Sequence, residues 1–158
     1  MQQITSDHFC GGVMFKQEAG KWYVLSVTSN RFPESVKIPG GTNQNARWET
    51  KEQTLLREFP EETSYTVVDY VHDAVHMISC DNGHTKNFYL ITKASGKLAI
   101  GESKTVNEPD GDVLTVRWIE LSEFIAKLYM VQREAFQMAM SKFAELSQKF
   151  AEDNYERI

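Results

Sequence analysis

The residues best suited to chemistry lie in one short acidic stretch. Residues 49–62 contain only two basic side chains but five glutamates: Glu49, Glu52, Glu58, Glu61 and Glu62. On a helix, residues three and four apart share a face, so Glu58, Glu61 and Glu62 would crowd one surface. Like charges at this spacing repel, and the end of a helix favours cations, so helix stability does not explain the cluster. Mg²⁺ explains it, because this cation prefers carboxylates, waters and substrate phosphates as ligands. A solvated acidic face is the plainer alternative.

A helix over 50–62 would position these carboxylates. Leu55, Leu56 and Phe59 recur at helical spacing and predict a face buried against the core, opposite the acids. Pro60 falls inside the last turn, where a proline removes one backbone hydrogen bond at a cost of about 3 kcal/mol. We therefore expect a kink in the turn that presents Glu61.

Short strands are expected on both sides of this helix. Apolar and β-branched runs predict strands over 9–16 and 22–28, joined by a hairpin through 17–20. A short strand over 35–38 is expected to stop at Pro39-Gly40-Gly41. Valine-rich and alternating runs then predict one or two strands over 65–80, a turn at 81–84, a strand over 85–92, a loop over 107–112 and a strand over 113–119.

Two helices are expected after the last strand. Ser122 would cap a short helix with Phe124, Ile125 and Leu128 facing inward. A longer helix over about 131–152 carries a stripe at spacings of three or four, made of Phe136, Met140, Phe143, Leu146 and Phe150. Such a stripe is typical of packing on the core, and a dimer surface is the alternative. Strands with interspersed helices indicate an α+β sandwich rather than a doubly wound sheet.

Length and charge limit the classes of function. The chain has 158 residues, the size of a single domain over 1–158, and its net charge is −5. An acidic chain without a basic cluster is a poor binder of nucleic acid or of membrane surfaces, and it has no apolar run long enough to span a bilayer. The first seven residues lack the pattern of a secretory signal. Because Cys10 and Cys80 form no CxxC pattern, we expect a reduced, cytoplasmic protein.

The acidic stretch resembles the signature of the Nudix, or MutT-like, hydrolases. That signature reads G-x5-E-x7-R-E-U-x-E-E-x-G-U, where U is a bulky apolar residue, and the matching residues here are Gly41, Glu49, Arg57, Glu58, Phe59, Glu61, Glu62 and Tyr65. Three departures stand out. The interval from Gly41 to Glu49 is two residues longer, Ser64 replaces the glycine that ends the helix, and Pro60 lies within it. Serine in a left-handed conformation costs about 1 kcal/mol.

The resemblance implies a fold, an activity and a set of roles. The fold would be an α/β/α sandwich with a mixed β-sheet. The activity would be metal-dependent hydrolysis, with Mg²⁺ or Mn²⁺, of a pyrophosphate bond in a nucleoside diphosphate linked to another group. The metal ligands would be Glu58, Glu61 and Glu62, with Glu58 also orienting or deprotonating water, while Arg57 would steer the carboxylates and Glu49 would support them. Gly40 and Gly41 would let the backbone approach phosphate and metal.

Other site residues are less certain from sequence. A further acid would come from the loop before the last strand, where Glu108 and Asp112 are both candidates and turn chemistry is the alternative for each. Lys37 could meet phosphate or be a solvated strand lysine. Base stacking could use any of several aromatic residues, although core packing is the more ordinary role for them: Trp22, Phe32, Trp48, Phe88 and Tyr89.

Three functions are compatible with these residues. The first is a Nudix pyrophosphohydrolase acting on a nucleoside triphosphate or a nucleotide sugar. The second is a nucleotide-sensing or interaction module on the same scaffold with little turnover, which the departures at 42–48, Pro60 and Ser64 would favour. The third is an acidic domain that merely resembles the motif. A small nucleotide is the expected partner, a homodimer is possible, and neither a specific nucleic acid nor a membrane is expected.

Overall fold

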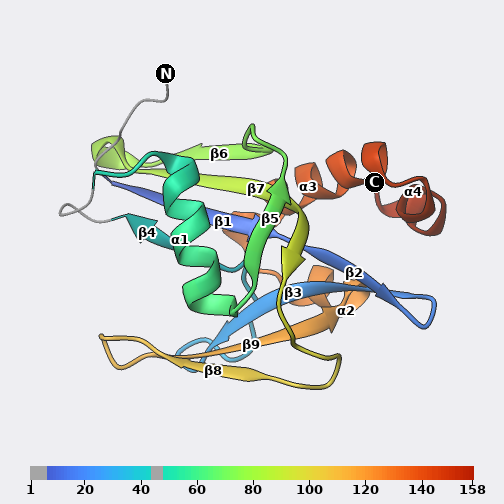
Figure 1. The fold of residues 1–158 in the computed structure, drawn as a ribbon, viewed down its shortest axis with the longest axis horizontal. Coiled ribbons are helices and arrows are strands. Elements are labelled where there is room, and N and C mark those ends of the chain that lie inside the picture. The colour runs from blue at the N-terminus through green and yellow to red at the C-terminus, as the bar shows by residue number, and fades with distance from the viewer. Residues whose placement is uncertain (1–6, 44–47) are drawn as a thin grey trace.

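Two β-sheets and the helices packed on them make up the computed structural model, which describes residues 7–43 and 48–158 (Figure 1). The first sheet is mixed: β1 and β7 run parallel, and the other pairs run antiparallel. It contains β4 (Gly40–Asn43), β1 (His8–Val13), β7 (Thr85–Ser95) and β5 (Thr66–Tyr70) in that order, with β6 (His76–Ser79) also paired to β7. The second sheet is antiparallel, in the order β2 (Phe15–Glu18), β3 (Lys21–Ser29), β9 (Val113–Glu120) and β8 (Lys104–Asn107).

The helices cover the sheets from different sides. Helix α1 (Lys51–Thr63) contacts β1, β4 and β5, whereas α3 (Arg133–Leu146) contacts β6 and β7. Helix α2 (Leu121–Lys127) packs on β3 and β9, and α4 (Gln148–Asn154) packs against α3. Neighbouring strand residues face opposite sides, since Phe88 belongs to the core cluster under α3 and Tyr89 to the cluster under α1. No helix in the described ranges is both long and apolar enough to cross a bilayer.

The predicted hairpin is confirmed, but the strand over 9–16 is two strands. They meet at Met14, and β1 belongs to the first sheet while β2 belongs to the second. The turn between β2 and β3 consists of Ala19 and Gly20, with φ of 52° and 78°. Two positive φ values are typical of the tight turn whose twist matches that of the paired strands.

Helix α1 confirms the predicted acidic helix almost to the residue. Thr50 caps its start, because the Thr50 hydroxyl accepts from the Gln53 N–H while the Gln53 side chain accepts from the Thr50 N–H. Leu55 and Phe59 are fully buried, but the prediction for Leu56 was wrong, since it is 43% exposed. The buried stripe continues instead through Thr54 and Thr63, on the other side of Leu55.

The end of α1 shows how the two departures are accommodated. The helix continues for three residues past Pro60, whose carbonyl accepts from the Ser64 N–H. Ser64 itself is in the left-handed conformation, with φ of 66°, as the resemblance to a glycine position implies. The kink at Pro60 stays a prediction. The longer interval before Glu49 includes 44–47, which lie outside the described residues.

The predicted strand over 35–38 was wrong in place. That segment makes only isolated bridges, from Lys37 to Val27 and from Val36 to Leu128, and the strand β4 begins at Gly40. Gly40 is needed there because a Cβ at this position would collide with the Cys10 carbonyl of β1. The glycines that were expected to stop a strand therefore allow a tight strand pairing. Strand β8 was missed, since it is a short, largely polar edge strand.

The carboxy-terminal stripe packs on the core, as its spacing predicts, but in two helices. The single helix over 131–152 breaks at Ser147, whose hydroxyl accepts from the Phe150 N–H and so starts α4. Phe150 and Phe136 are buried against Phe15, whereas Leu146 is 56% exposed. The dimer surface stays untested.

The cap assigned to Ser122 was wrong as well. Helix α2 begins two residues earlier than that cap implies, at Leu121, and its N-cap Glu120 makes no side-chain capping bond. Phe124 and Leu128 are buried, as expected for the inward face of this helix. The two cysteines, Cys10 and Cys80, are free thiols.

The left-handed conformation of Ser64 gives a first prediction. Ser64→Gly should raise the free energy of unfolding by about 0.5–1 kcal/mol, because glycine adopts positive φ without a Cβ clash. Urea denaturation followed by circular dichroism measures this change. Ser103→Gly is the matched control, since Ser103 lies outside the positive-φ positions of the described chain, and it should give no gain. An equal gain in both variants would contradict the assignment.

Candidate active site

Four carboxylates line one open cavity of about 640 Å³ between α1, β4 and the loop after β8. Three of them, Glu58, Glu61 and Glu62, come from the last two turns of α1, as the helical spacing predicts. The fourth is Glu108, in the loop that precedes β9. The backbone of Gly40 and Gly41 forms part of the same wall. The structure therefore brings together segments far apart in the sequence.

Arg57 contacts two acids of α1 and a third, Glu49, that precedes the helix. Its Nε and Nη2 each donate to a different oxygen of Glu49, both at 2.8 Å, which is a bidentate pair. Its Nη1 donates to Glu58 at 2.7 Å and lies 3.5 Å from Glu61. Arg57 thus contacts the carboxylates that it was expected to steer, and the steering role itself stays a prediction. The hydrogen bonds to Glu49 are the main reason that the pKa of Arg57 is raised, so the guanidinium stays charged.

Glu49 is itself held by Thr54, which also contacts His8 of the first sheet. The Thr54 hydroxyl donates to Glu49 at 3.4 Å, and the same hydroxyl lies 2.7 Å from Nε2 of the buried His8 in β1. Burial is the largest cause of the lowered pKa of His8, which favours the neutral ring. A chain of polar contacts therefore runs from the first sheet to the bidentate pair.

Glycine at positions 40 and 41 permits close approach to the acids. A Cβ on Gly41 would overlap the Glu58 carboxylate, and the Gly40 N–H donates to Glu62 at 3.1 Å. The resemblance implies that the backbone of these glycines approaches phosphate and metal. The structure shows that they approach the carboxylates, and the approach to phosphate and metal stays a prediction.

Burial and crowding make the carboxylates hard to ionise together. Burial raises the pKa of Glu62 to about 8, the Gly40 N–H lowers it, and the neighbouring Glu108 and Glu58 raise it. Burial also raises the pKa of Glu58, against the opposing effect of Arg57. A cation in the cavity would relieve this cost, because it interacts only with the ionised form.

Lys104 is a residue of this region that the sequence alone did not single out. Its amino group in β8 lies 3.3 Å from the Glu62 carbonyl and 3.5 Å from the Glu61 carbonyl, at the end of α1. A helix end favours a cation, and this lysine supplies the charge that the last turn of the helix itself lacks. The missed strand β8 is thus the element that carries this cation to the site.

The structure separates the two candidates for the further acid. Glu108 joins the cavity of the helix carboxylates. Asp112 does not; its carboxylate accepts from the Ser29 hydroxyl at 2.8 and 2.9 Å and lines a second pocket of about 240 Å³. The position of Asp112 immediately before β9 explains this role, since it fastens the loop to β3. Which of the two takes part in chemistry stays a prediction.

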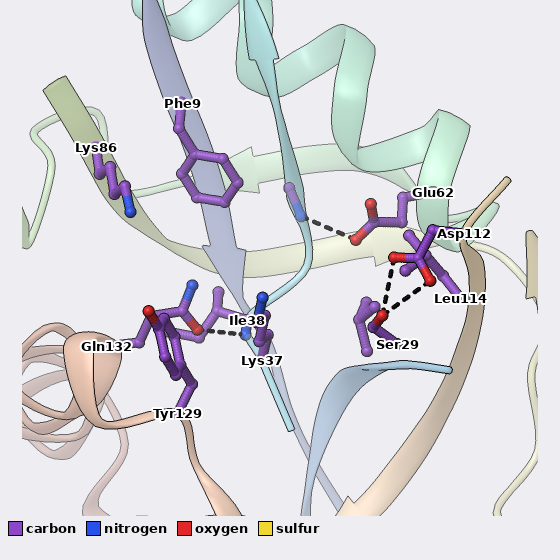
Figure 2. Close-up of a pocket in the computed structure, with 12 residues that line it drawn as sticks. Phe9, Ser29, Lys37, Ile38, Glu62, Lys86, Asp112, Leu114, Tyr129 and Gln132 are labelled. Carbon is purple, nitrogen blue, oxygen red and sulfur yellow. Dashed lines mark hydrogen bonds between the residues drawn. The ribbon is translucent and has the colours of Figure 1, made fainter. Parts of the chain in front are cut away.

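The second pocket adjoins the first. Phe9, Gly40 and Glu62 line both, so a ligand could extend from one to the other. Figure 2 shows Glu62 and Asp112 on one side of the second pocket and Gln132 and Tyr129 on the other. Lys37 also lines it, with its amino group 5.0 Å from the centre of the Tyr129 ring.

The aromatic residues of this pocket differ from those considered from sequence. Phe88 and Tyr89 are buried in the core, Trp22 packs against Phe143 and Phe150, and Phe32 and Trp48 are exposed. The pocket uses Phe9 and Tyr129 instead, together with Gln132 and Lys86. Strand alternation could have placed Phe9 near the site, but no local signal marks residues 129–132.

The donor set fits a divalent cation, although its carboxylates are engaged with other groups of the chain. Carboxylate oxygens from several side chains surround one cavity, and burial raises the pKa of two of them, Glu58 and Glu62. As they stand, no three acidic, histidine or cysteine side chains of the described residues converge as a metal site requires. The contacts explain this, because Glu58 and Glu61 face Arg57 and Glu62 is bonded to Gly40. Cation binding would require the carboxylates to exchange these partners.

Solved structures of other proteins have the same fold. A MutT NUDIX hydrolase from Burkholderia pseudomallei is 22% identical, with a TM-score of 0.58, over 85% of this chain and 98% of its own. An Ap4A hydrolase of C. elegans, in a binary complex, is 18% identical, with a TM-score of 0.61, over 87% of this chain and 98% of its own. No family model matches the sequence, and no curated protein matches it.

A third neighbour combines the fold with other partners. NrtR of Shewanella oneidensis is 17% identical, with a TM-score of 0.61, over 87% of this chain and 63% of its own; its NUDIX domain has been solved with ADP ribose, and the protein with a 27mer DNA. These likenesses show that the chain has the Nudix fold, an α+β sandwich with a mixed sheet. The sequence resemblance is confirmed at the level of the fold.

The raised pKa of Glu62 gives a pH prediction for the metal-free protein. Between about pH 4.5, the ordinary value, and pH 8, the unfolded chain has lost this proton while the folded chain keeps it. Because the unfolded state then binds fewer protons, stability falls as pH rises through this window. Glu62→Gln keeps the acceptor for Gly40 and removes the charge, so its advantage over the parent should grow from pH 4.5 to 8.

Urea unfolding in the presence of EDTA at a series of pH values measures this difference. Glu34→Gln, at an exposed position, is the matched control and should show no such trend. A constant difference between the Glu62→Gln variant and the parent across the window would contradict the prediction.

Proposed function

We propose that the protein is a Nudix pyrophosphohydrolase that cleaves a nucleoside diphosphate linked to another group, such as a nucleoside triphosphate or a nucleotide sugar. The observation that carries the proposal is the cavity in which the helix acids of the Nudix motif meet Glu108 beside a second pocket. The fold shared with MutT and Ap4A hydrolase proteins supports it.

The cofactor in this proposal is Mg²⁺ or Mn²⁺, held by Glu58, Glu61 and Glu62. Such a cation, when bound, neutralises phosphate charge and lowers the pKa of water. The other steps belong to the chain itself. Arg57 keeps the carboxylates close to one another, and Glu49 orients Arg57 through the bidentate pair. Gly41 leaves room for Glu58, which we assign to orienting or deprotonating the attacking water.

The two joined pockets suit a substrate with two parts. The acidic cavity would take the diphosphate, and the second pocket, with Phe9 and Tyr129, would take the attached planar or sugar group. Lys37 lines the second pocket and would meet a phosphate only where that substrate part carries one. Glu108 faces the diphosphate side, and Asp112 faces the other part.

The alternative function is a nucleotide-sensing or interaction module that has the same fold but little turnover. In NrtR, a domain with this fold has been solved in complex with ADP ribose, and the protein that contains it has been solved in complex with DNA. Pro60 and Ser64, two departures from the motif at the end of α1, favour a sensing module of this kind. We rank it second, because all the acids of the motif are retained and three of them, Glu58, Glu61 and Glu62, line one cavity.

A substrate panel tests the proposal. The parent protein should release a mononucleotide from at least one nucleoside diphosphate derivative when Mg²⁺ or Mn²⁺ is present, with products identified by mass spectrometry. Glu61→Gln should lower kcat at least about tenfold, the lower end of what even outer-shell partners of a metal contribute. Glu61 is exposed, so this variant should keep its fold.

The control for this panel is Glu34→Gln, which changes an exposed acid away from the cavity and should keep full activity. If no compound gives a product but a nucleotide binds tightly by calorimetry, the sensing module is the correct function and the enzyme is excluded. If there is neither product nor binding, the remaining hypothesis is an acidic domain that merely resembles the motif.

A further inference from the structure

We propose that the second pocket selects a 6-oxopurine, guanine or hypoxanthine, and rejects adenine, because Gln132 and Lys86 present hydrogen-bond donors to it. This inference rests on the proposed function for the place of the diphosphate. It concerns the specificity of the adjoining pocket, which neither the motif nor the likeness of fold determines.

The orientation of the Gln132 amide is fixed by the backbone. Gln132 is 94% buried, and its Oε1 accepts from the Ile38 N–H at 2.8 Å. A backbone N–H can only donate, so the atom facing Ile38 must be the oxygen and the NH₂ group must point the other way. Figure 2 shows this nitrogen turned toward the side of the pocket where Phe9 and Lys86 lie. None of the described residues accepts a hydrogen bond from it.

Lys86 adds a second donor on the same side. It is the strand neighbour of Phe9, since Phe9 of β1 pairs with Lys86 of β7, and both residues line the pocket. A lysine amino group donates and never accepts. This side of the pocket therefore offers two groups that can only donate, whereas the Tyr129 hydroxyl beside Gln132 can donate or accept. The acceptors, Glu62, Asp112 and the Ser29 hydroxyl, lie on the opposite side, toward the diphosphate cavity.

Base chemistry selects the ligand for such a wall. Guanine presents two neighbouring acceptors, O6 and N7, whereas adenine presents N7 beside the N6 amino donor. With the phosphates at Glu62, the far edge of a purine stacked on Phe9 would meet Gln132 and Lys86. An adenine amino group would then face an amide donor that cannot turn, because turning would break the bond to Ile38 and leave a buried N–H unpaired. Hypoxanthine keeps O6 and N7 and should bind like guanine.

The 35–38 segment, which is not a regular strand, positions Tyr129 and Gln132 in this pocket. The Val36 carbonyl accepts from the Tyr129 N–H, and Val36 bridges to Leu128. Ile38, two residues on, then fixes Gln132. The 35–38 segment thus joins the second pocket to the glycine wall of the first, with no need for regular strand pairing.

Steady-state kinetics with GTP, ITP and ATP tests the proposal in the full chain. We expect kcat/KM for GTP and ITP to exceed that for ATP at least about tenfold, as is usual where a buried donor or acceptor would be left unpaired. Calorimetry with the α,β-methylene analogues of GTP and ATP measures the same ratio in binding, without turnover. The ratio in binding tests the base, and the presence of product tests the proposed hydrolysis, so the two can fail separately.

Gln132→Glu is the decisive variant. It keeps an oxygen for the Ile38 N–H and replaces the free donor by an acceptor, so the preference for guanine over adenine should fall by about tenfold or more. Lys86→Met, which keeps the apolar stem, should lower the same preference and covers the case in which a buried glutamate impairs folding. Gln137→Glu, on the exposed face of α3, is the matched control and should leave the preference unchanged.

Two results would overturn the proposal. One is a parent protein that binds the ATP analogue as tightly as the GTP analogue, or that binds neither. The other is a guanine preference that survives in a folded Gln132→Glu variant and in Lys86→Met, which would place the base elsewhere. A preference for GTP with no affinity for ITP would likewise overturn it, because the 2-amino edge would then be the part that is read.

Discussion

The structure depends on one cation that the chain supplies itself, the guanidinium of Arg57. It faces Glu49, just before the start of α1, and Glu58 and Glu61, near its end. Without it these carboxylates would repel one another, and the end of the helix disfavours the negative charge of the last two. Lys104 performs a similar task at the backbone, beside the last carbonyls of α1. Positive charge supplied by the chain therefore helps to hold the cluster together. A divalent cation would take over a role that Arg57 already performs in part.

Backbone geometry brings the rest of the site to these acids. Gly40 lets β4 approach β1, and Gly41 leaves room for the Glu58 carboxylate, so two missing side chains determine the shape of the cavity wall. His8 and Thr54 hold Glu49 from the sheet side. The parallel pair of β1 and β7 places Phe9 and Lys86 side by side, and the hydrogen bond from the Tyr129 N–H to the Val36 carbonyl brings Tyr129 to the same pocket. The acidic cavity beside α1 thus adjoins a pocket lined by strand residues and by Tyr129 and Gln132, which precede α3.

Local patterns were sufficient to predict α1 and its acids, because helical spacing and charge act within a few residues. The same holds for the hairpin at Ala19-Gly20, where turn chemistry is local. Prediction failed where long-range packing decides. Leu56 is exposed because the sheet lies nearer Thr54, and 35–38 makes only bridges because it joins two parts of the fold. Gln132 and Tyr129 could not be found from sequence, since only the bond to Ile38 and the bridge at Val36 bring them to the site.

A crystal of the protein soaked in Mn²⁺ tests the central claim most directly, because manganese scatters anomalously and reports its own position. The account predicts an anomalous peak in the acidic cavity, bound by oxygens from at least two of Glu58, Glu61 and Glu62, with Glu61 turned away from Arg57. A cavity with no peak, in which the same carboxylates still face Arg57 and Gly40, would contradict it.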